Sequence, residues 1–240
     1  MKQSVKIAWL YPDLMSTYGD RGNVVVLQKR AVWRGIAASV VPVTLETNVK
    51  MLLGCDVIFM GGAQDRQQKL AGEDFLKHKG PAVKKMVEAG VPALFVCAAY
   101  QFVGHYYKPY QGEKIPGAGI FDLYTEHPGD QAKRLIGNVV ARVQHPEELA
   151  GTTIVGFENH GGQTHLGAKM KPLAKIIKGN GNNGVDGWEG AVYNNAIGSY
   201  FHGPLLPKNP AIADWLLEKA IGHLAPLDDS LELAANNAVR

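Results

Sequence analysis

The sequence predicts a single α/β domain on a doubly wound, mostly parallel sheet, with antiparallel additions in its second half. In the first half, short apolar runs alternate with segments of helical periodicity, the pattern of parallel strands joined by helices. In the second half, strand-like segments follow one another at short spacing between Gly and Asn turns, which is typical of antiparallel pairing. A chain of 240 residues with 46% hydrophobic content is long enough for one sizeable core.

The first half supplies strands and helices in turn. Residues 5–11 (VKIAWLY) predict a buried strand, and residues 22–36 predict a helix that Gly35 helps to stop. The amphipathic segment 82–90 predicts a helix closed by Gly90. The further strands expected here are residues 39–43, 55–62 and 91–97, the last followed directly by the start of a helix.

The second half is richer in turns. Its strand signals lie at residues 117–126, 136–143, 152–162 and 187–203. Residues 210–224 have the apolar spacing of a strong amphipathic helix. We therefore expect one domain over residues 1–225. The polar, Ala/Asn-rich tail, residues 226–240, is expected to be a frayed helix or disordered.

Composition excludes several function classes. The net charge of +3 is mild and no basic stripe with interleaved aromatic residues occurs, so nucleic acid is not indicated. Two distant cysteines make neither a disulfide framework nor a zinc pattern, and a reducing cytoplasm is the expected location. No apolar run of about 18 residues predicts a membrane span, and the N-terminus is interpreted as a strand instead of a signal peptide.

The stretch PALFVCAAYQ, residues 92–101, places a cysteine where an expected strand gives way to a helix. Ligands of open α/β sheets bind beyond the carboxyl ends of the strands, and a helix N-terminus favours thiolate. Cys97 is therefore either a nucleophile or a small buried residue that closes the strand, and position alone does not decide. Cys55 precedes its strand, so it is expected only to pack.

Glycines and histidines offer further candidates at strand ends. The pair in FMGGAQD, Gly61 and Gly62, could bring backbone N–H groups close to a ligand, although a tight loop explains it equally well. His202 ends the apolar run AIGSYFHGP, which suits a general base, and His160 in FENHGGQTH is its rival. Either histidine could pair with a cysteine nucleophile.

Together, the segments FMGGAQD, VCAAYQFVG, GFENHGGQT and GSYFHGPLLPKNP resemble class I glutamine amidotransferases of the cobyric-acid-synthase-like branch. Matching segments run from TYGDRGN, near residue 17, to the helix ending near residue 222, so the resemblance covers nearly the whole chain. It implies a flavodoxin-like sheet and hydrolysis of L-glutamine to supply ammonia. The FENHGG and HGPLLPKN segments favour the members of this branch that serve amidation of lipid II.

The resemblance implies roles for particular residues. Cys97 falls at the position of the family's nucleophile and His202 at that of its general base. Arg134, in KRLIGN, matches an arginine that holds the substrate, and a guanidinium can grip the α-carboxylate of glutamine with two hydrogen bonds. The other implied site residues are Gly62 and Ala98, as N–H donors to the oxyanion, and Gln101, in the glutamine pocket.

The chain departs from the family pattern at the cysteine turn. The usual segment is Gly-x-Cys-Gly-Gly-Tyr-Gln, whereas here Phe95 replaces the first glycine and Ala98 and Ala99 replace the next two. An added methyl group can restrict a strained turn. We therefore expect a turn of somewhat different shape, with Phe95 directed into the core.

A second departure concerns the group that orients the histidine. Many class I members carry an acid two residues after it, where this chain has Pro204. The expected machinery is therefore a dyad of Cys97 and His202, with an orienting group such as Glu158 or Asn159.

The acceptor chemistry is expected on another protein. The chain has no GxxxxGK[ST] motif or other ATP signature, so the resemblance implies a separate MurT-type ligase that binds ATP and Mg²⁺ and amidates the D-glutamate of lipid II. No cofactor or metal is expected in this chain. Segment TYGDRGN and residues 109–112 are candidate contacts with the ligase.

Other functions stay open from the sequence. The acceptor could be cobyrinate or another acid, because only the partner would contact it. A non-catalytic subunit could keep the fold, although retention of Cys97, His202 and the glycine pair speaks against it. Another cysteine hydrolase on a similar sheet is the third alternative, against which Tyr100, Gln101 and Arg134 favour glutamine.

Overall fold

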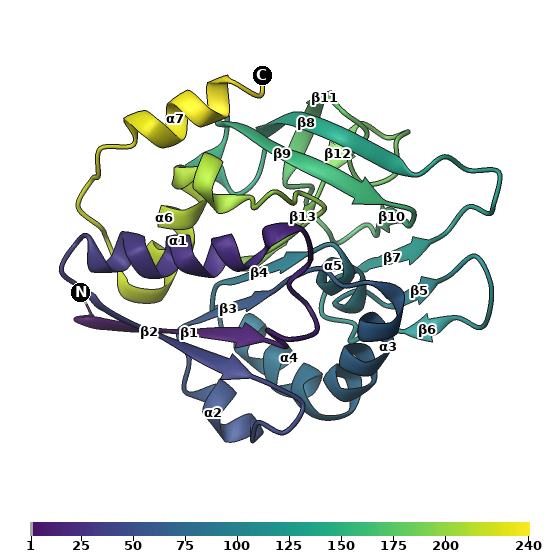
Figure 1. Ribbon diagram of the computed structural model, residues 1–240, viewed down its shortest axis with the longest axis horizontal. Coiled ribbons are helices and arrows are strands. Elements are labelled where there is room, and N and C mark those ends of the chain that lie inside the picture. Colours follow the sequence, from purple (N-terminus) through teal and green to yellow (C-terminus); the bar gives the residue numbers. More distant parts are fainter. Residues whose placement is uncertain (1) are drawn as a thin grey trace.

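The computed structural model describes residues 2–240, apart from the side chains of residues 65 and 66. Within this part the chain forms three sheets with helices packed around them (Figure 1). Along the main sheet the strand order is β13 (Ala191–Tyr193), β14 (Ala196–Ser199), β4 (Ala93–Val96), β3 (Val57–Met60), β1 (Ser4–Leu10) and β2 (Ala37–Val43). Neighbouring strands run parallel except β13, which confirms the predicted class.

Helices cover both faces of the main sheet. Helices α1 (Arg21–Val32) and α6 (Pro210–Ile221) lie on one face, and α2 (Val49–Leu53) and α4 (Gly80–Glu88) lie on the other (Figure 1). Successive strand residues alternate between the two cores, since Phe59 packs with α1 and α6 whereas Ile58 faces the opposite core. Phe95 is fully buried in that second core, as predicted.

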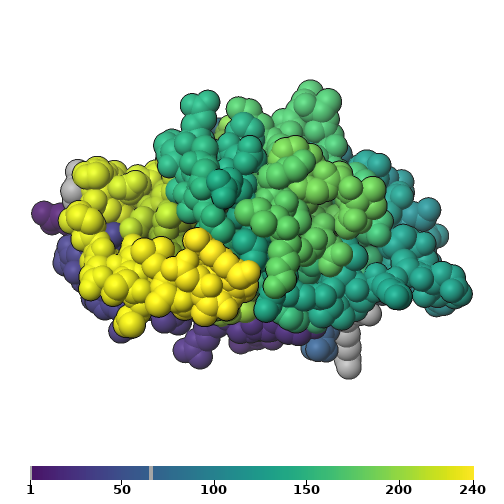
Figure 2. Space-filling model, turned by 90° about the horizontal axis from the view of Figure 1, so that it is seen from above, coloured from purple at the N-terminus to yellow at the C-terminus, as the bar shows by residue number. Residues whose placement is uncertain are grey.

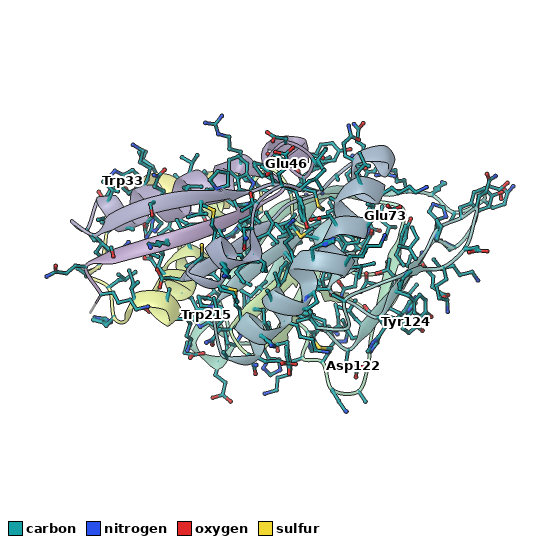
Figure 3. All side chains as sticks on the ribbon, turned by 90° about the horizontal axis from the view of Figure 1, so that it is seen from below. Trp33, Glu46, Glu73, Asp122, Tyr124 and Trp215 are labelled. Carbon is teal, nitrogen blue, oxygen red and sulfur yellow. The ribbon has the colours of Figure 1, made fainter. Side chains whose placement is uncertain are left out.

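Two smaller sheets contain the additions of the second half. One has the order β10 (Gln163–Leu166), β7 (Leu123–Glu126), β5 (Tyr106–Lys108) and β6 (Ile115–Pro116). The other has the order β12 (Trp188–Glu189), β11 (Ala174–Lys178), β8 (Leu135–Val143) and β9 (Thr153–His160). The antiparallel pairs here confirm the expected additions. Trp33, just beyond α1, and Tyr124, on β7, lie at opposite ends of the molecule (Figure 3).

The segment 187–203 differs from the expected single strand. It divides into β12, β13 and β14, because Gly190 (φ +63°) and Asn194 (φ +51°) turn the chain between them. Strand β14 then joins the main sheet parallel to β4, with Ile197 beside Leu94. This pairing brings the carboxyl end of β14 next to that of β4.

The helices show further differences from the prediction. Helix α1 ends at Val32, and the chain turns at Gly35 with a φ of +73°. The pattern did not predict α2 or α3 (Asp65–Asp74), which continues through a π-helical turn (Phe75–Lys79) into α4. In the described chain, no helix combines the length and apolar character needed to cross a bilayer.

The tail is ordered instead of frayed. Helix α7 (Ser230–Asn237) lies along the domain surface, seen in yellow beside the green second half in Figure 2. Its buried residue Asn236 donates its side-chain amide to the carbonyl oxygens of Thr153 and Lys208. Before the helix, Asp229 forms an ion pair with the buried guanidinium of Arg30 on α1. Polar contacts therefore fix a segment whose composition suggested disorder.

Candidate active site

Cys97 occupies a strained turn at the carboxyl edge of the main sheet. It follows β4 and precedes α5 (Ala98–Phe102), with φ +55° and ψ −107°, a conformation that a residue with a side chain rarely adopts. The turn is held because the N–H of Cys97 donates to the carbonyl of Ser199, at 2.9 Å, on neighbouring β14. Ala98 begins α5, so its N–H is one that the helix itself leaves without a partner.

His202 reaches the same edge from β14. Its backbone pairs with Phe157 of β9 in an antiparallel bridge, which anchors the histidine between two sheets. The imidazole is buried, and its Nδ1 lies 3.1 Å from Oδ1 of Asp20. Asp20 is equally buried and immediately precedes α1. The group that orients the histidine is therefore Asp20.

The predicted orienting groups, Glu158 and Asn159, have other partners, so that prediction was wrong. The carboxylate of Glu158 accepts hydrogen bonds from the backbone of Asn180 and Gly181. Residue 159 accepts from an arginine, as described below. The sequence signal for Asp20 was its place in TYGDRGN, shortly after the first strand, because carboxyl ends of parallel strands share one edge of the sheet.

Gly62 lies at the centre of this arrangement. A Cβ atom at this position would lie 2.8 Å from Cε1 of His202 and 3.3 Å from the Cβ of Cys97. The cysteine and the histidine therefore converge on a space that only glycine leaves open. The N–H of Gly62 donates to Oδ2 of Asp20 at 2.7 Å, and its carbonyl accepts from the N–H and hydroxyl of Thr17.

These contacts bear on the predicted oxyanion donors. The structure directs the N–H of Gly62 to Asp20, so this donor would have to exchange that hydrogen bond before it could serve a reacting oxygen. The N–H of Ala98 lies at the start of α5, directly after the sulfur-bearing residue. Donation to an oxyanion by either residue stays a prediction, with Ala98 the better placed of the two.

The surroundings of His202 favour its protonated form. Burial lowers the pKa of His202, but the negative charge of the Cys97 thiolate and the hydrogen bond to Asp20 outweigh it and raise the pKa to about 10. Nδ1 faces Asp20, which leaves the buried Nε2 to exchange a proton with the neighbouring sulfur of Cys97. A thiolate beside an imidazolium is suited to attack on an acyl carbon.

The other candidate histidine and cysteine, His160 and Cys55, make contacts that are typical of packing residues. The ring of His160 stacks on Tyr200 with a centroid distance of 3.6 Å, and its Nδ1 lies 2.7 Å from the carbonyl of Gly162. Burial lowers the pKa of His160 to about 4, so this ring is neutral near pH 7. Cys55 is buried at the opposite end of β3, where its thiol contacts the carbonyl of Met51, which confirms its packing role.

Gln101 and Arg134 lie on either side of the turn after β9. The carboxamide of Gln101 donates to the hydroxyl of Tyr200 at 3.2 Å and accepts from Gln68 at 3.1 Å. Arg134, just before β8, donates from Nε to Oδ1 of Asn159 at 2.7 Å. The hydrogen-bonded amide of Gln101 and the exposed guanidinium of Arg134 thus flank this turn. An amino acid ligand requires groups of these two kinds.

The surface hollows do not coincide with this site. Hollows of about 600 and 330 Å³ are present, and neither is lined by Cys97 or His202. The larger lies between the turn after β8 and the β13–β14 turn, and the smaller lies at the carboxyl ends of β1 and β2. Cys97 and His202 are instead packed closely around Gly62. Among the described residues, no cluster of His, Cys, Asp and Glu has a metal-binding arrangement.

Residues 6–210 match the CobB/CobQ-like glutamine amidotransferase domain. The chain belongs to this family. It is 42% identical over 208 residues to the lipid II isoglutaminyl synthase (glutamine-hydrolyzing) subunit GatD of Staphylococcus aureus, covering 87% of this chain and 81% of the relative. With the GatD subunit of Streptococcus pneumoniae the identity is 36% over 217 residues, covering 90% of this chain and 80% of the relative.

Proteins of much lower sequence identity share this fold. The structure of PurLQS from Thermotoga maritima matches with a TM-score of 0.60 and 15% identity, covering 92% of this chain and 98% of that chain. At this identity the likeness concerns the fold alone.

Proposed function

We propose that this chain is the glutaminase subunit of a lipid II isoglutaminyl synthase. The observation that carries the proposal is the convergence of Cys97, His202 and Asp20 on Gly62, in a chain 42% identical to a GatD subunit over 87% of its length. The fold alone would not separate glutamine hydrolysis from other cysteine chemistry. The triad provides a nucleophile, a proton carrier and an orienting carboxylate for acyl transfer.

The first half of the reaction follows from the ion pair. The Cys97 thiolate attacks the side-chain amide carbon of glutamine, and negative charge develops on the amide oxygen. The N–H of Ala98 stabilises this oxyanion, joined by that of Gly62 once its bond to Asp20 is exchanged. The C–N bond breaks as His202 donates its proton to the leaving nitrogen, so that ammonia departs and a glutamyl thioester remains.

The second half regenerates the enzyme. His202, now neutral, takes a proton from water as the water oxygen attacks the thioester carbon. The C–S bond breaks, glutamate leaves and the thiolate–imidazolium pair is restored. Asp20 keeps Nδ1 of His202 in place throughout, so that Nε2 carries the proton to and from the reacting atoms. Arg134 holds the α-carboxylate of glutamine, and Gln101 lines the side-chain pocket.

The ammonia requires an acceptor on another subunit. Free ammonia is protonated in water and lost as a nucleophile, so a glutaminase of this kind works beside a synthetase. We assign that role to a separate MurT-type ligase that binds ATP and Mg²⁺ and amidates the D-glutamate of lipid II. The complex would act in the cytoplasm, where it reaches lipid II at the inner face of the membrane through the ligase.

The test compares glutamate release from glutamine by the full chain, with and without its co-purified ligase. Cys97→Ala should abolish release, whereas Cys55→Ala, the matched control at the opposite edge of the sheet, should retain it. Amidation of lipid II by the complex should then depend on glutamine in the wild type and on added ammonia in Cys97→Ala. Normal release by Cys97→Ala would overturn the mechanism. Release without lipid II amidation would instead point to another acceptor.

A further inference from the structure

Tyr18 is an exposed tyrosine that lies directly over the buried catalytic histidine. Its ring meets the imidazole of His202 edge to face, with centroids 4.9 Å apart and planes inclined at 62°. The backbone of Tyr18 has a φ of +56°, a strained conformation for a residue with a side chain. Neighbouring contacts hold this strain in place, because Thr17 and Asp20 on either side are both hydrogen-bonded to Gly62.

The hydroxyl of Tyr18 connects to the predicted substrate arginine. It accepts a hydrogen bond of 3.0 Å from Nδ2 of Asn159, whose Oδ1 accepts from Nε of Arg134 at 2.7 Å. An arginine can only donate, so the carbonyl side of the Asn159 amide must face it, which leaves the NH₂ side for Tyr18. The carboxamide therefore has one orientation that satisfies both partners.

We propose that Tyr18 is a positioning residue that couples capture of glutamine by Arg134 to the shielding of His202. The proposal rests on the glutaminase function proposed above and adds a residue to it. A substrate carboxylate bound by the guanidinium fixes the Arg134 side chain, which fixes the Asn159 amide and, through it, the Tyr18 ring. The ring then keeps water from the imidazolium while the thioester forms.

The geometry distinguishes this role from simple packing. Tyr18 is 48% exposed, so its ring adds little to the core, and its hydroxyl binds a side chain that itself binds an exposed arginine. A tyrosine needed only for folding would gain nothing from this connection. Tyr124 is a matched comparison, since it is partly exposed and its ring lies near another histidine, His165, at 5.1 Å between ring centroids.

The test is a double-mutant cycle on the complex of the full chain with its ligase. Tyr18→Phe keeps the ring and removes the hydroxyl. It should raise KM for glutamine roughly three- to tenfold, the range for loss of one neutral hydrogen bond, with kcat within about twofold. In the Arg134→Ala background the same change should have no further effect, because the connection is already broken. Tyr124→Phe should match the wild type in both backgrounds.

A second variant and the melting temperature separate the alternatives. Tyr18→Leu removes the ring and should also lower kcat, because water reaches His202. If wild type neither binds nor hydrolyses glutamine, the proposed function fails and the role of Tyr18 fails with it. If wild type is active but Tyr18→Phe leaves KM within twofold, or lowers activity equally in both backgrounds, only the role of Tyr18 is overturned. A lowered Tm with equal losses would assign Tyr18 to fold support.

Discussion

Replacing Asp20 with asparagine removes the charge that orients the catalytic histidine while keeping the size of the side chain. The carboxylate accepts the N–H of Gly62 at 2.7 Å through one oxygen and contacts Nδ1 of His202 at 3.1 Å through the other. An asparagine that keeps the first bond through its carbonyl must direct its NH₂ group at the Nδ1–H of an imidazolium. Two donors would then face each other in a buried site, which disfavours the charged ring.

The magnitude follows from the pKa of His202. An opposite charge within about 4–6 Å shifts a pKa by roughly 1–3 units, so the value of about 10 should fall to between about 7 and 9 in Asp20→Asn. Because the folded-state pKa is raised, the imidazolium is present below it and is lost as pH rises through it. The alkaline limb of kcat/KM should therefore move down by about 1–3 units, and activity at pH 9 should fall by a factor between about 2 and about 90.

The assay is glutamate release by the chain and its ligase between about pH 6 and pH 10.5. Asp13→Asn is the matched control, because Asp13 is an exposed acid in the same loop and contacts neither the glycine nor the histidine. Its profile should follow the wild type. An Asp20→Asn profile whose alkaline limb stays in place, with kcat/KM within twofold, would refute the assignment of Asp20 as the orienting group.

Three further predictions test other contacts. Gly62→Ala would place a Cβ 2.8 Å from the catalytic imidazole, so kcat should fall at least about tenfold, whereas Gly54→Ala, where the nearest atom is at 3.7 Å, should be active; equal activities would contradict the packing. Asn236→Ala should lower the free energy of unfolding by about 1–3 kcal/mol in urea, because the part-buried carbonyls of Thr153 and Lys208 lose their donor, and exposed Asn237→Ala should not; an unchanged midpoint would mean that α7 is not held there. The pKa of His160, lowered to about 4, means that stability is lost as pH falls from about 6.5 towards 4, by about 2 kcal/mol at pH 5; His160→Gln should remove this loss, and equal slopes would contradict it.

The sequence predicted the parallel half of the fold because that half is coded locally. Buried strands in a parallel sheet are continuous apolar runs, and each was followed by a segment of helical spacing. The cysteine turn was visible for the same reason, since PALFV ends at Cys97 and helix-forming residues follow. The local pattern predicted where Cys97 lies but not its chemical role. The resemblance to a family was needed to choose the nucleophile and to prefer His202 over His160.

What the sequence did not predict depends on contacts between distant segments. Asp20 meets a histidine 182 residues away, and the meeting requires Tyr18 in a left-handed conformation that no propensity favours. Helix α7 is held by an ion pair with Arg30 and by the amide of Asn236, whereas periodicity detects only apolar faces. The departure at residues 98 and 99 does not prevent a turn with φ +55° at the cysteine.

The glycine pair shows how one motif acquires a different meaning once the fold is known. In the sequence, a Gly-Gly turn after a strand suggested donors for an oxyanion. In the structure, the N–H and the carbonyl of Gly62 both bind the loop that carries Asp20, and the absent side chain leaves room for Cys97 and His202. Gly62 is therefore the residue on which Cys97, His202 and Asp20 converge. Because the N–H of Gly62 donates to Asp20, we predict that stabilisation of a reacting oxygen begins at the N–H of Ala98.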